Sequence, residues 1–238
     1  MFRALWRVLY PSRCVACGRF QHETLCQACE ARLAPILPPA CRRCGAPVRN
    51  MGDCRACLDC DYAFDAAVCG GLYVGSVRRA VLNLKFRRWW RAAEPLASLL
   101  WDALQAPERA ALLQVDAIVP APIHPARRTM RGFNQAELIA HWLSEWSSVP
   151  VRTDWLRRRF YRRPQVGLSG AERLRNVQNA FEVNRPDALR ERTVWLLDDV
   201  FTTGSTLDAC ARALKNAGVR FVIALAVARD LREDALTL

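Results

Sequence analysis

The chain has 238 residues, of which 52% are hydrophobic, and its formal net charge is +12. This composition excludes a collagen, a coiled coil and a disordered tail, and the apolar runs are shorter than the ~20 residues that a membrane span needs. Residues 70–193 hold 21 of the 35 basic side chains and 11 of the 23 acidic ones, so the positive charge lies in the middle. Arginine outnumbers lysine 33 to two, which reflects either bidentate phosphate binding or a GC-rich genome.

The first ten residues predict a short amphipathic helix, with one apolar face formed by Phe2, Leu5, Trp6 and Leu9. This face would pack on the adjacent Cys-rich segment or touch a membrane surface. Arg3 and Arg7 interrupt the apolar residues and no small-residue cleavage site follows. We therefore expect no secretory signal and a cytoplasmic location.

Eight cysteines form four CxxC pairs, namely Cys14 and Cys17, Cys26 and Cys29, Cys41 and Cys44, and Cys54 and Cys57. Two intervening residues let both sulfurs of a pair reach one tetrahedral metal ion, so the spacing predicts two structural Zn2+ sites of four thiolates each. The sites are joined either sequentially or as a cross-brace. The alternative, a disulfide framework, requires an oxidising compartment that the N-terminal segment does not indicate.

Zinc changes the charge of this segment. Eight thiolates and two Zn2+ ions contribute −8 and +4, which lowers the effective net charge to about +8 and leaves the Cys-rich module nearly neutral. We therefore predict that the module stabilises the fold or forms a surface for a partner, rather than serving as the main DNA-binding region. Cys60 and His22 are weaker candidate ligands, whereas Cys69 and Cys210 lie in apolar surroundings and are predicted as core residues.

After residue 62 the sequence alternates between helix and strand patterns. We expect helices over 78–86, 95–104, 133–146 and 206–216, and strands over 117–120, 193–197 and 220–228. Such alternation predicts an α/β domain with a parallel sheet and flanking helices. The predicted division is a zinc-binding module at 1–62 and an α/β domain at 63–238.

The segment 194–206 carries the clearest chemical signal. Its apolar strand ends in Asp198 and Asp199, and a short polar loop, Thr202, Thr203, Gly204, Ser205 and Thr206, leads into a helix. Backbone N–H groups at such a helix start bind anions, and a glycine allows close approach. The two carboxylates suit sugar hydroxyls or Mg2+. The alternative is an ordinary helix cap with Asp and Thr as turn formers.

This segment resembles the phosphoribosyl pyrophosphate (PRPP) signature of type I phosphoribosyltransferases. The resemblance implies that Asp198 and Asp199 face the ribose hydroxyls and that residues 202–206 hold the 5′-phosphate. The run at 119–135, the Cys pairs, and the segment Arg-Pro-Gln-Val-Gly-Leu-Ser at 163–169 resemble the ComF family. That resemblance implies a bacterial phosphoribosyltransferase-fold protein of DNA uptake or DNA utilisation, with single-stranded DNA and a DNA-uptake helicase as associated partners.

Two basic groups complete the candidate site. Arg127, Arg128 and Arg131 follow a strand end and would contact pyrophosphate, with Arg131 the best candidate and Lys85 a weaker one. A second group, Arg158, Arg159, Arg162 and Arg163, is interleaved with aromatic residues, as in proteins that bind single strands. The alternatives are a solvated basic face for the first group and a basic hairpin with its rings in the core for the second.

Two functions fit these features. The first is a phosphoribosyltransferase that uses PRPP and Mg2+, in which Asp198 or Asp199 stabilises positive charge at the ribose. The second is a protein of the same pathway without catalysis, which senses PRPP or a nucleotide and binds single-stranded DNA. Pyrophosphate release would favour the first, and DNA binding that survives loss of both aspartates would favour the second.

Overall fold

The computed structural model describes residues 13–50, 54–58, 60–158 and 180–231. The predicted helix at 2–9 lies outside these residues. A single parallel sheet organises the chain, with strands β1 (Ala66–Leu72), β2 (Ala117–Pro120), β5 (Thr193–Phe201) and β6 (Phe221–Arg229). Their order is β1-β6-β5-β2. The strands are buried along most of their length, as expected when both faces of a parallel sheet are covered.

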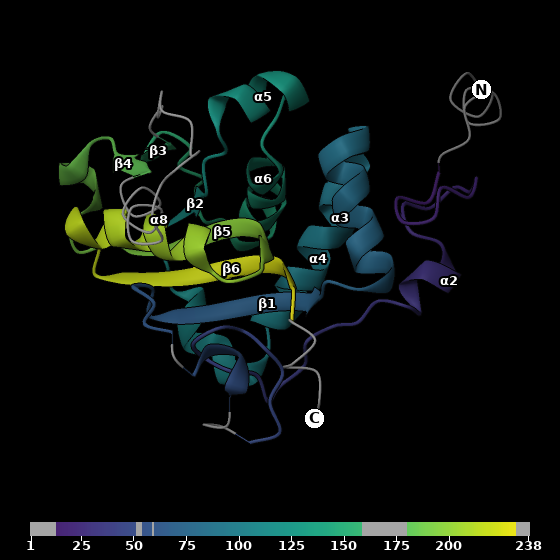
Figure 1. Cartoon of the computed structure of the whole chain (residues 1–238), viewed down its shortest axis with the longest axis horizontal. Coiled ribbons are helices and arrows are strands. Elements are labelled where there is room, and N and C mark those ends of the chain that lie inside the picture. The colour runs from purple at the N-terminus through teal and green to yellow at the C-terminus, as the bar shows by residue number, and fades with distance from the viewer. Residues whose placement is uncertain (1–12, 51–53, 59, 159–179, 232–238) are drawn as a thin grey trace, which may run out of the picture.

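Alternate residues of β5 define the two faces of this sheet. Trp195 and Leu197 pack with α3 (Gly75–Arg87), α4 (Ala93–Leu104) and α6 (Gln135–Ser147). Val194 and Leu196 pack with α8 (Ser205–Asn216) and with the hairpin of β3 (Leu156–Arg158) and β4 (Phe181–Val183). The sheet therefore lies between two layers, with α8 in front of it and α4 and α6 behind it in Figure 1.

The predicted elements agree with the structure in type, and their bounds differ at one place that matters for the site. The strand expected at 193–197 extends to Phe201, because β6 beside it continues to Arg229 and pairs Asp198 with Ala226 and Val200 with Ala228. Both aspartates thus lie within the strand. The remaining elements are α2 (Gln27–Glu30), α5 (Pro125–Arg131), and the 3-10 turns η1 (Arg55–Cys57), η2 (Trp90–Ala92), η3 (Pro107–Leu113) and η4 (Pro186–Leu189).

The second Cys-rich segment is built onto the edge of the sheet. Pro35 forms an antiparallel bridge with Gly71, and the Ala67 N–H donates to the Arg42 carbonyl at 2.8 Å. Gly45 lies so close to Cys69 that a Cβ at position 45 would be 2.6 Å from the Cys69 Sγ. The segment that the sequence separates as a module therefore shares its core with β1.

The first Cys-rich segment is attached through α3. The Asn83 side-chain amide donates to the carbonyls of Val15 and Ala16, at 2.8 and 3.3 Å. Val15 is buried with the apolar side chains of α3 and α4. In Figure 1 this segment, with α2, lies on the far side of α3 from the sheet.

Candidate phosphate site and metal centres

Two groups of four cysteines bring their sulfurs together. Within each group the Sγ atoms lie within 4.8 Å of one another, and the groups are Cys14, Cys17, Cys26, Cys29 and Cys41, Cys44, Cys54, Cys57. The sulfurs of Cys17 and Cys26 are 3.8 Å apart, and those of Cys41 and Cys57 are 3.6 Å apart. A Zn–S distance near 2.3 Å in a tetrahedron places sulfurs ~3.8 Å apart, so both groups fit a Zn2+ ion. Of the two predicted connections, the structure adopts the sequential one.

The other cysteines take the places expected of them. Cys69 on β1 and Cys210 on α8 are fully buried among apolar side chains, as predicted. Cys60 and His22 belong to neither group of possible metal ligands among the described residues. Cys60 is held instead through its backbone, since its carbonyl accepts a hydrogen bond from the Arg43 guanidinium.

The loop after β5 is a polar turn at the start of α8. Gly204 has a φ of +80°, a left-handed value that favours glycine, and it precedes the first residue of α8. The Thr203 hydroxyl lies 3.0 Å from the Ser205 hydroxyl and accepts from the Ser205 N–H at 3.4 Å. The loop is therefore a turn of hydroxyls and N–H groups at the positive end of a 12-residue helix.

Two side chains that sequence reasoning did not include fix this loop from behind. The Tyr62 hydroxyl donates to the Thr203 carbonyl at 3.0 Å. The buried Arg229 guanidinium donates to the carbonyls of Phe201 and Thr202, at 3.0 and 2.6 Å, and lies over the Phe201 ring. These donors thus hold the backbone carbonyls of residues 201–203. The sequence could have pointed to Arg229, because it is a charged residue at the end of an apolar strand. Nothing in the sequence points to Tyr62.

Asp198 and Asp199 point to opposite faces of β5, since neighbouring residues of a strand alternate. The Asp199 carboxylate forms an ion pair with Lys85 of α3, with 2.8 Å between Oδ1 and Nζ. Both side chains are mostly buried. Asp198 lies on the side of α8 and accepts the Asp199 N–H at 2.8 Å. Burial, together with the nearby Asp199 charge, raises the pKa of Asp198 to about 7.

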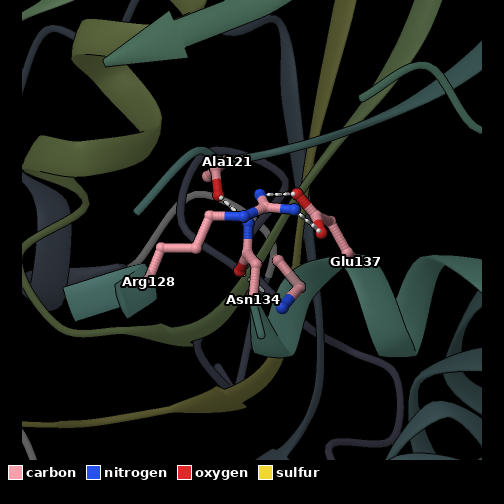
Figure 2. A network of polar contacts seen from close by, with 5 residues as sticks. Ala121, Arg128, Asn134 and Glu137 are labelled. Carbon is pink, nitrogen blue, oxygen red and sulfur yellow. Dashed lines mark hydrogen bonds and ion pairs between the residues drawn. The ribbon is translucent and has the colours of Figure 1, made fainter. Parts of the chain in front are cut away.

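The arginines of α5 divide between two roles. Arg128 forms a double hydrogen bond with Glu137 of α6, at 2.6 and 3.1 Å, beside the bond from Asn134 to the Ala121 carbonyl (Figure 2). Arg128 is thus engaged within the fold. Arg131 is closer to the predicted role: its Nε is buried without a hydrogen-bond partner, its guanidinium lies over the Phe86 ring, and Asp199 is among the charges that act on it. Burial lowers the pKa of Arg131 below its usual range.

Arg158, predicted to contact nucleic acid, lies near Asp198. It ends β3, lies over the Phe181 ring and interacts electrostatically with Asp198 and Arg127. Burial lowers its pKa as well. Trp155, at the start of this hairpin, is buried in the core, as in the alternative of a basic hairpin. The other three arginines of that prediction, Arg159, Arg162 and Arg163, lie outside the described residues.

His124 has a local structural role. It is the N-cap of α5, where its Nδ1 accepts the Ala126 N–H at 3.2 Å.

The candidate site combines groups from several segments. At the carboxyl edge of the sheet the structure brings together two carboxylates, a hydroxyl-rich loop, and the cations Lys85, Arg131 and Arg158. This collection can hold a phosphorylated sugar, with anionic groups at the loop and cations and hydroxyls at the carboxylates.

Comparisons with known proteins agree with this picture. Residues 5–60 match a double zinc ribbon domain. Competence protein F of Haemophilus influenzae is 31% identical over 91% of this chain and 96% of its own length. DNA utilization protein YhgH of Escherichia coli K12 is 30% identical over 88% of this chain and 92% of its own length.

The chain belongs to the ComF family. For this ComF-family protein the predicted architecture is confirmed: a parallel sheet with flanking helices follows a Cys-rich zinc ribbon module. Similar solved structures include a PRPP amidotransferase from B. subtilis (16% identity, TM-score 0.40). The match covers 57% of this chain and 26% of that one. Another is a purine phosphoribosyltransferase from Pyrococcus horikoshii, at 17% identity and TM-score 0.36, over 59% of this chain and 83% of that one.

None of the helices in the described part of the chain combines the length and the apolar content that crossing a bilayer requires.

Proposed function

We propose that this protein binds PRPP together with Mg2+ and acts in DNA uptake or DNA utilisation in the cytoplasm. The observation that carries the proposal is the juxtaposition of Asp198 and Asp199 with the loop at 202–206, opposite Lys85 and Arg131. The role in DNA utilisation is inferred from the names of its relatives, a competence protein and a DNA utilization protein.

In this proposal each part of PRPP has a partner. The 5′-phosphate binds the N–H and hydroxyl groups of residues 202–206 at the start of α8. Asp198 and Asp199 accept hydrogen bonds from the ribose hydroxyls, and Arg131 and Lys85 neutralise the pyrophosphate. Of these groups, Arg131 has a buried Nε that lacks a protein acceptor, which a phosphate oxygen would supply.

Mg2+ fits this site only with oxygens from the ligand. The protein offers two carboxylates, and one of them is already paired with Lys85. Mg2+ prefers one or two carboxylates together with substrate phosphates, so this donor set suits a cation that enters with PRPP. Its contribution would be to neutralise the pyrophosphate charge.

We also propose the division into a zinc module at 1–62 and a phosphoribosyltransferase-like domain at 63–238. The zinc ions would stabilise the two ribbons, and the second ribbon in turn covers β1. A structural role follows from the closed four-thiolate sets, which leave no coordination position for a substrate.

The test is calorimetric titration of PRPP with Mg2+ into the wild type and into Asp198→Asn/Asp199→Asn. This double change keeps the side-chain shapes and removes both charges. We expect binding to the wild type and a loss of at least tenfold in the variant. The matched control is Asp154→Asn/Asp187→Asn, which removes two exposed carboxylates elsewhere and should bind as the wild type does. Absence of binding to the wild type would overturn the proposal. If the wild type binds PRPP, release of pyrophosphate in the presence of candidate acceptors would establish turnover.

A further inference from the structure

The phosphate loop, residues 202–206, contacts the chain that follows the second zinc site. The Tyr62 hydroxyl donates to the Thr203 carbonyl at 3.0 Å. The Tyr62 ring lies against Gly204, since a Cβ at position 204 would be 2.9 Å from the Cε1 atom of that ring. Phe201 meets the same ring edge to face, with 5.8 Å between the ring centroids. One aromatic side chain therefore contacts the loop at two successive residues and the strand end before it.

The residues on either side of this tyrosine are bonded to α8, the helix that follows the phosphate loop. The Asp61 carbonyl accepts a hydrogen bond from the Arg212 guanidinium at 2.9 Å. The Ala63 N–H donates to the Asp208 carboxylate at 2.8 Å, and the same carboxylate pairs with Arg212 at 3.0 Å. Asp208 lies in the first turn of α8. Three consecutive residues, 61–63, thus hold both the loop and the start of the helix, and we call them the brace.

The brace is attached to both CxxC turns of the second zinc site. From the second turn, the Cys60 N–H donates back to the carbonyl of the ligand Cys57 at 3.1 Å. From the first turn, the guanidinium of Arg43, which lies between the two cysteines of that pair, donates to the Cys60 carbonyl. Cys60 directly precedes the brace. The sulfurs of Cys41 and Cys57, one from each turn, are 3.6 Å apart, so a shared metal ion would join the two turns that hold the brace.

The second site depends on its metal ion for this shape. Its four sulfurs lie within 4.8 Å of one another. Thiolates at this separation repel one another unless a cation neutralises them, and protonated thiols have no strong attraction that would replace the metal. Loss of Zn2+ would therefore let the two CxxC turns separate, and the contacts of Cys60 with both turns would be lost with them.

We propose that the second zinc ribbon positions the phosphate loop through the brace, so that zinc at this site sets the affinity of the loop for a phosphorylated sugar. The positioning does not need a ligand, whereas the effect on affinity rests on the proposed function. An anion site at a helix start works by aligning several N–H and hydroxyl donors on one phosphate, and a displaced donor binds weakly.

The first ribbon has a different contact. Its backbone accepts hydrogen bonds from Asn83 of α3 at the carbonyls of Val15 and Ala16. Among the hydrogen bonds of the described residues, none joins this ribbon to the phosphate loop or to α8. The two zinc sites therefore provide matched variants, since loss of either removes one metal ion and only the second is attached to the loop.

The first experiment measures hydrogen–deuterium exchange of the full chain without ligand, in peptides that cover residues 201–208. Cys54→Ser removes a half-buried ligand of the second site, and Cys17→Ser, which removes an exposed ligand of the first site, is the control. We expect exchange in these peptides to be about fivefold faster in Cys54→Ser and to change less than about twofold in Cys17→Ser. Unchanged exchange of residues 193–197 in β5 would show that the sheet is intact.

The second experiment compares three ligands by calorimetry, all with Mg2+: PRPP, ribose 5-phosphate and pyrophosphate. In the proposed function ribose 5-phosphate uses the phosphate loop, whereas pyrophosphate uses Lys85 and Arg131. For Cys54→Ser we expect binding of PRPP and of ribose 5-phosphate to be about tenfold weaker, in the range that two misaligned hydrogen bonds contribute. Pyrophosphate binding should change less than about twofold, because the brace is bonded to the loop and to α8. A general loss of folding would weaken all three alike.

A further variant removes contacts of the brace without changing a metal ligand. Tyr62→Phe/Arg212→Gln deletes two of its hydrogen bonds and should keep both zinc ions. We expect ribose 5-phosphate to bind about tenfold more weakly. Added to Cys54→Ser, this change should bring the total loss to less than about thirtyfold, instead of the roughly hundredfold of independent effects, because both act through one contact. The matched control is Tyr73→Phe/Arg190→Gln, which changes the same residue types outside the brace.

Three results would each contradict the inference: equal exchange in the two cysteine variants, additive losses of ribose 5-phosphate affinity, or equal weakening of ribose 5-phosphate and pyrophosphate binding. Failure of the proposed function gives a different result. If the wild type binds none of the three ligands, the effect on affinity fails together with the proposed function. The exchange experiment, which contains no ligand, still decides whether the second ribbon positions the loop.

Discussion

Lys85 and Asp199 join the outer helix α3 to the end of the central strand β5, with 2.8 Å between Nζ and Oδ1. Of the two neighbouring aspartates, only Asp199 has an ion pair in the described part of the chain, and Asp198 has none. The same lysine lowers the pKa of Asp198 against the larger opposing effects of burial and of the Asp199 charge. One cation therefore joins α3 to β5 and partly offsets the rise in the pKa of Asp198.

Removing this lysine should destabilise the fold. We expect Lys85→Met to cost about 3 kcal/mol, because it leaves the mostly buried Asp199 charge without its partner. Urea unfolding at pH 7.5 would measure the change. Lys85→Met/Asp199→Leu should recover most of the loss. Lys215, the only other lysine, pairs with Asp65 at a more exposed position and provides the control, with an expected cost of about 1 kcal/mol or less for Lys215→Met. Equal losses for the two lysines would contradict the assignment.

The pKa of Asp198 predicts an unusual dependence of stability on pH. Its value of about 7 in the fold is above the ordinary 3.8, so the folded protein binds this proton more tightly than the unfolded chain does. The stabilisation is complete below about pH 3.8 and is lost as the pH rises through 7. Asp198→Asn should therefore be more stable than the wild type at pH 8, by about 4 kcal/mol, and the two should converge near pH 4. Calorimetric scans from pH 4 to 8 without ligand would measure the difference.

Asp116 offers a control of opposite sign for this pH dependence. Its carboxylate accepts hydrogen bonds from the Thr193 N–H and from Arg192, both at 2.8 Å, and the bond from Thr193 is the main reason that its pKa is lowered. Its contribution is present above the ordinary pKa of 3.8 and is lost as the pH falls through the lower folded value. Asp116→Asn should thus lower the melting temperature at pH 8. A stabilising effect of both substitutions at pH 8 would argue against the environment assigned to Asp198.

The sequence predicted the parallel sheet, the eight thiolates and the loop because each has a local pattern. Period and spacing are visible in one segment, as in the apolar run of β5 or the CxxC pairs. The pairing of Lys85 with Asp199 and the bond from Tyr62 to Thr203 join residues more than 100 positions apart, and no local pattern encodes them. Arg158 shows the same limit, since no local pattern indicates that its guanidinium interacts electrostatically with Arg127 and Asp198.

The second ribbon should stabilise the sheet through its contact with β1. In Gly45→Ala the new Cβ would meet the Cys69 Sγ at 2.6 Å, at a φ of +68°. Gly132→Ala is the matched control, because Gly132 has a φ of +83° with no atom within 4 Å of its Cβ position. The backbone strain is shared by both variants and costs ~1 kcal/mol. We expect Gly45→Ala to lose roughly 2 kcal/mol more than Gly132→Ala in urea unfolding, the cost of overpacking a core. Equal losses would mean that the ribbon and the sheet are not in close contact.

The two zinc sites should differ in their effect on the whole fold. Cys41→Ser and Cys17→Ser each remove one thiolate and should each lower the zinc content, measured by mass spectrometry, from two per chain to about one. Cys41 lies in the core shared with β1, whereas Cys17 is exposed. The melting temperature should therefore fall further in Cys41→Ser, by roughly 4–8 °C more if the extra loss is about 2 kcal/mol. A larger fall in Cys17→Ser would contradict a sheet-supporting role for the second ribbon.

Tyr62 should affect ligand binding more than stability. Its hydroxyl donates to the Thr203 carbonyl at 3.0 Å, and its ring packs against Phe64 and Phe201 beneath Gly204. Tyr62→Phe keeps the ring and removes the bond that orients the loop, so we expect a change in unfolding free energy of at most ~1 kcal/mol and PRPP binding about fivefold weaker by calorimetry. Tyr73→Phe is the control, because it removes a hydroxyl from a residue outside the loop contacts and should leave PRPP affinity unchanged. Unaltered PRPP affinity in Tyr62→Phe would show that Arg229 alone, through its bonds to the Phe201 and Thr202 carbonyls, fixes the loop.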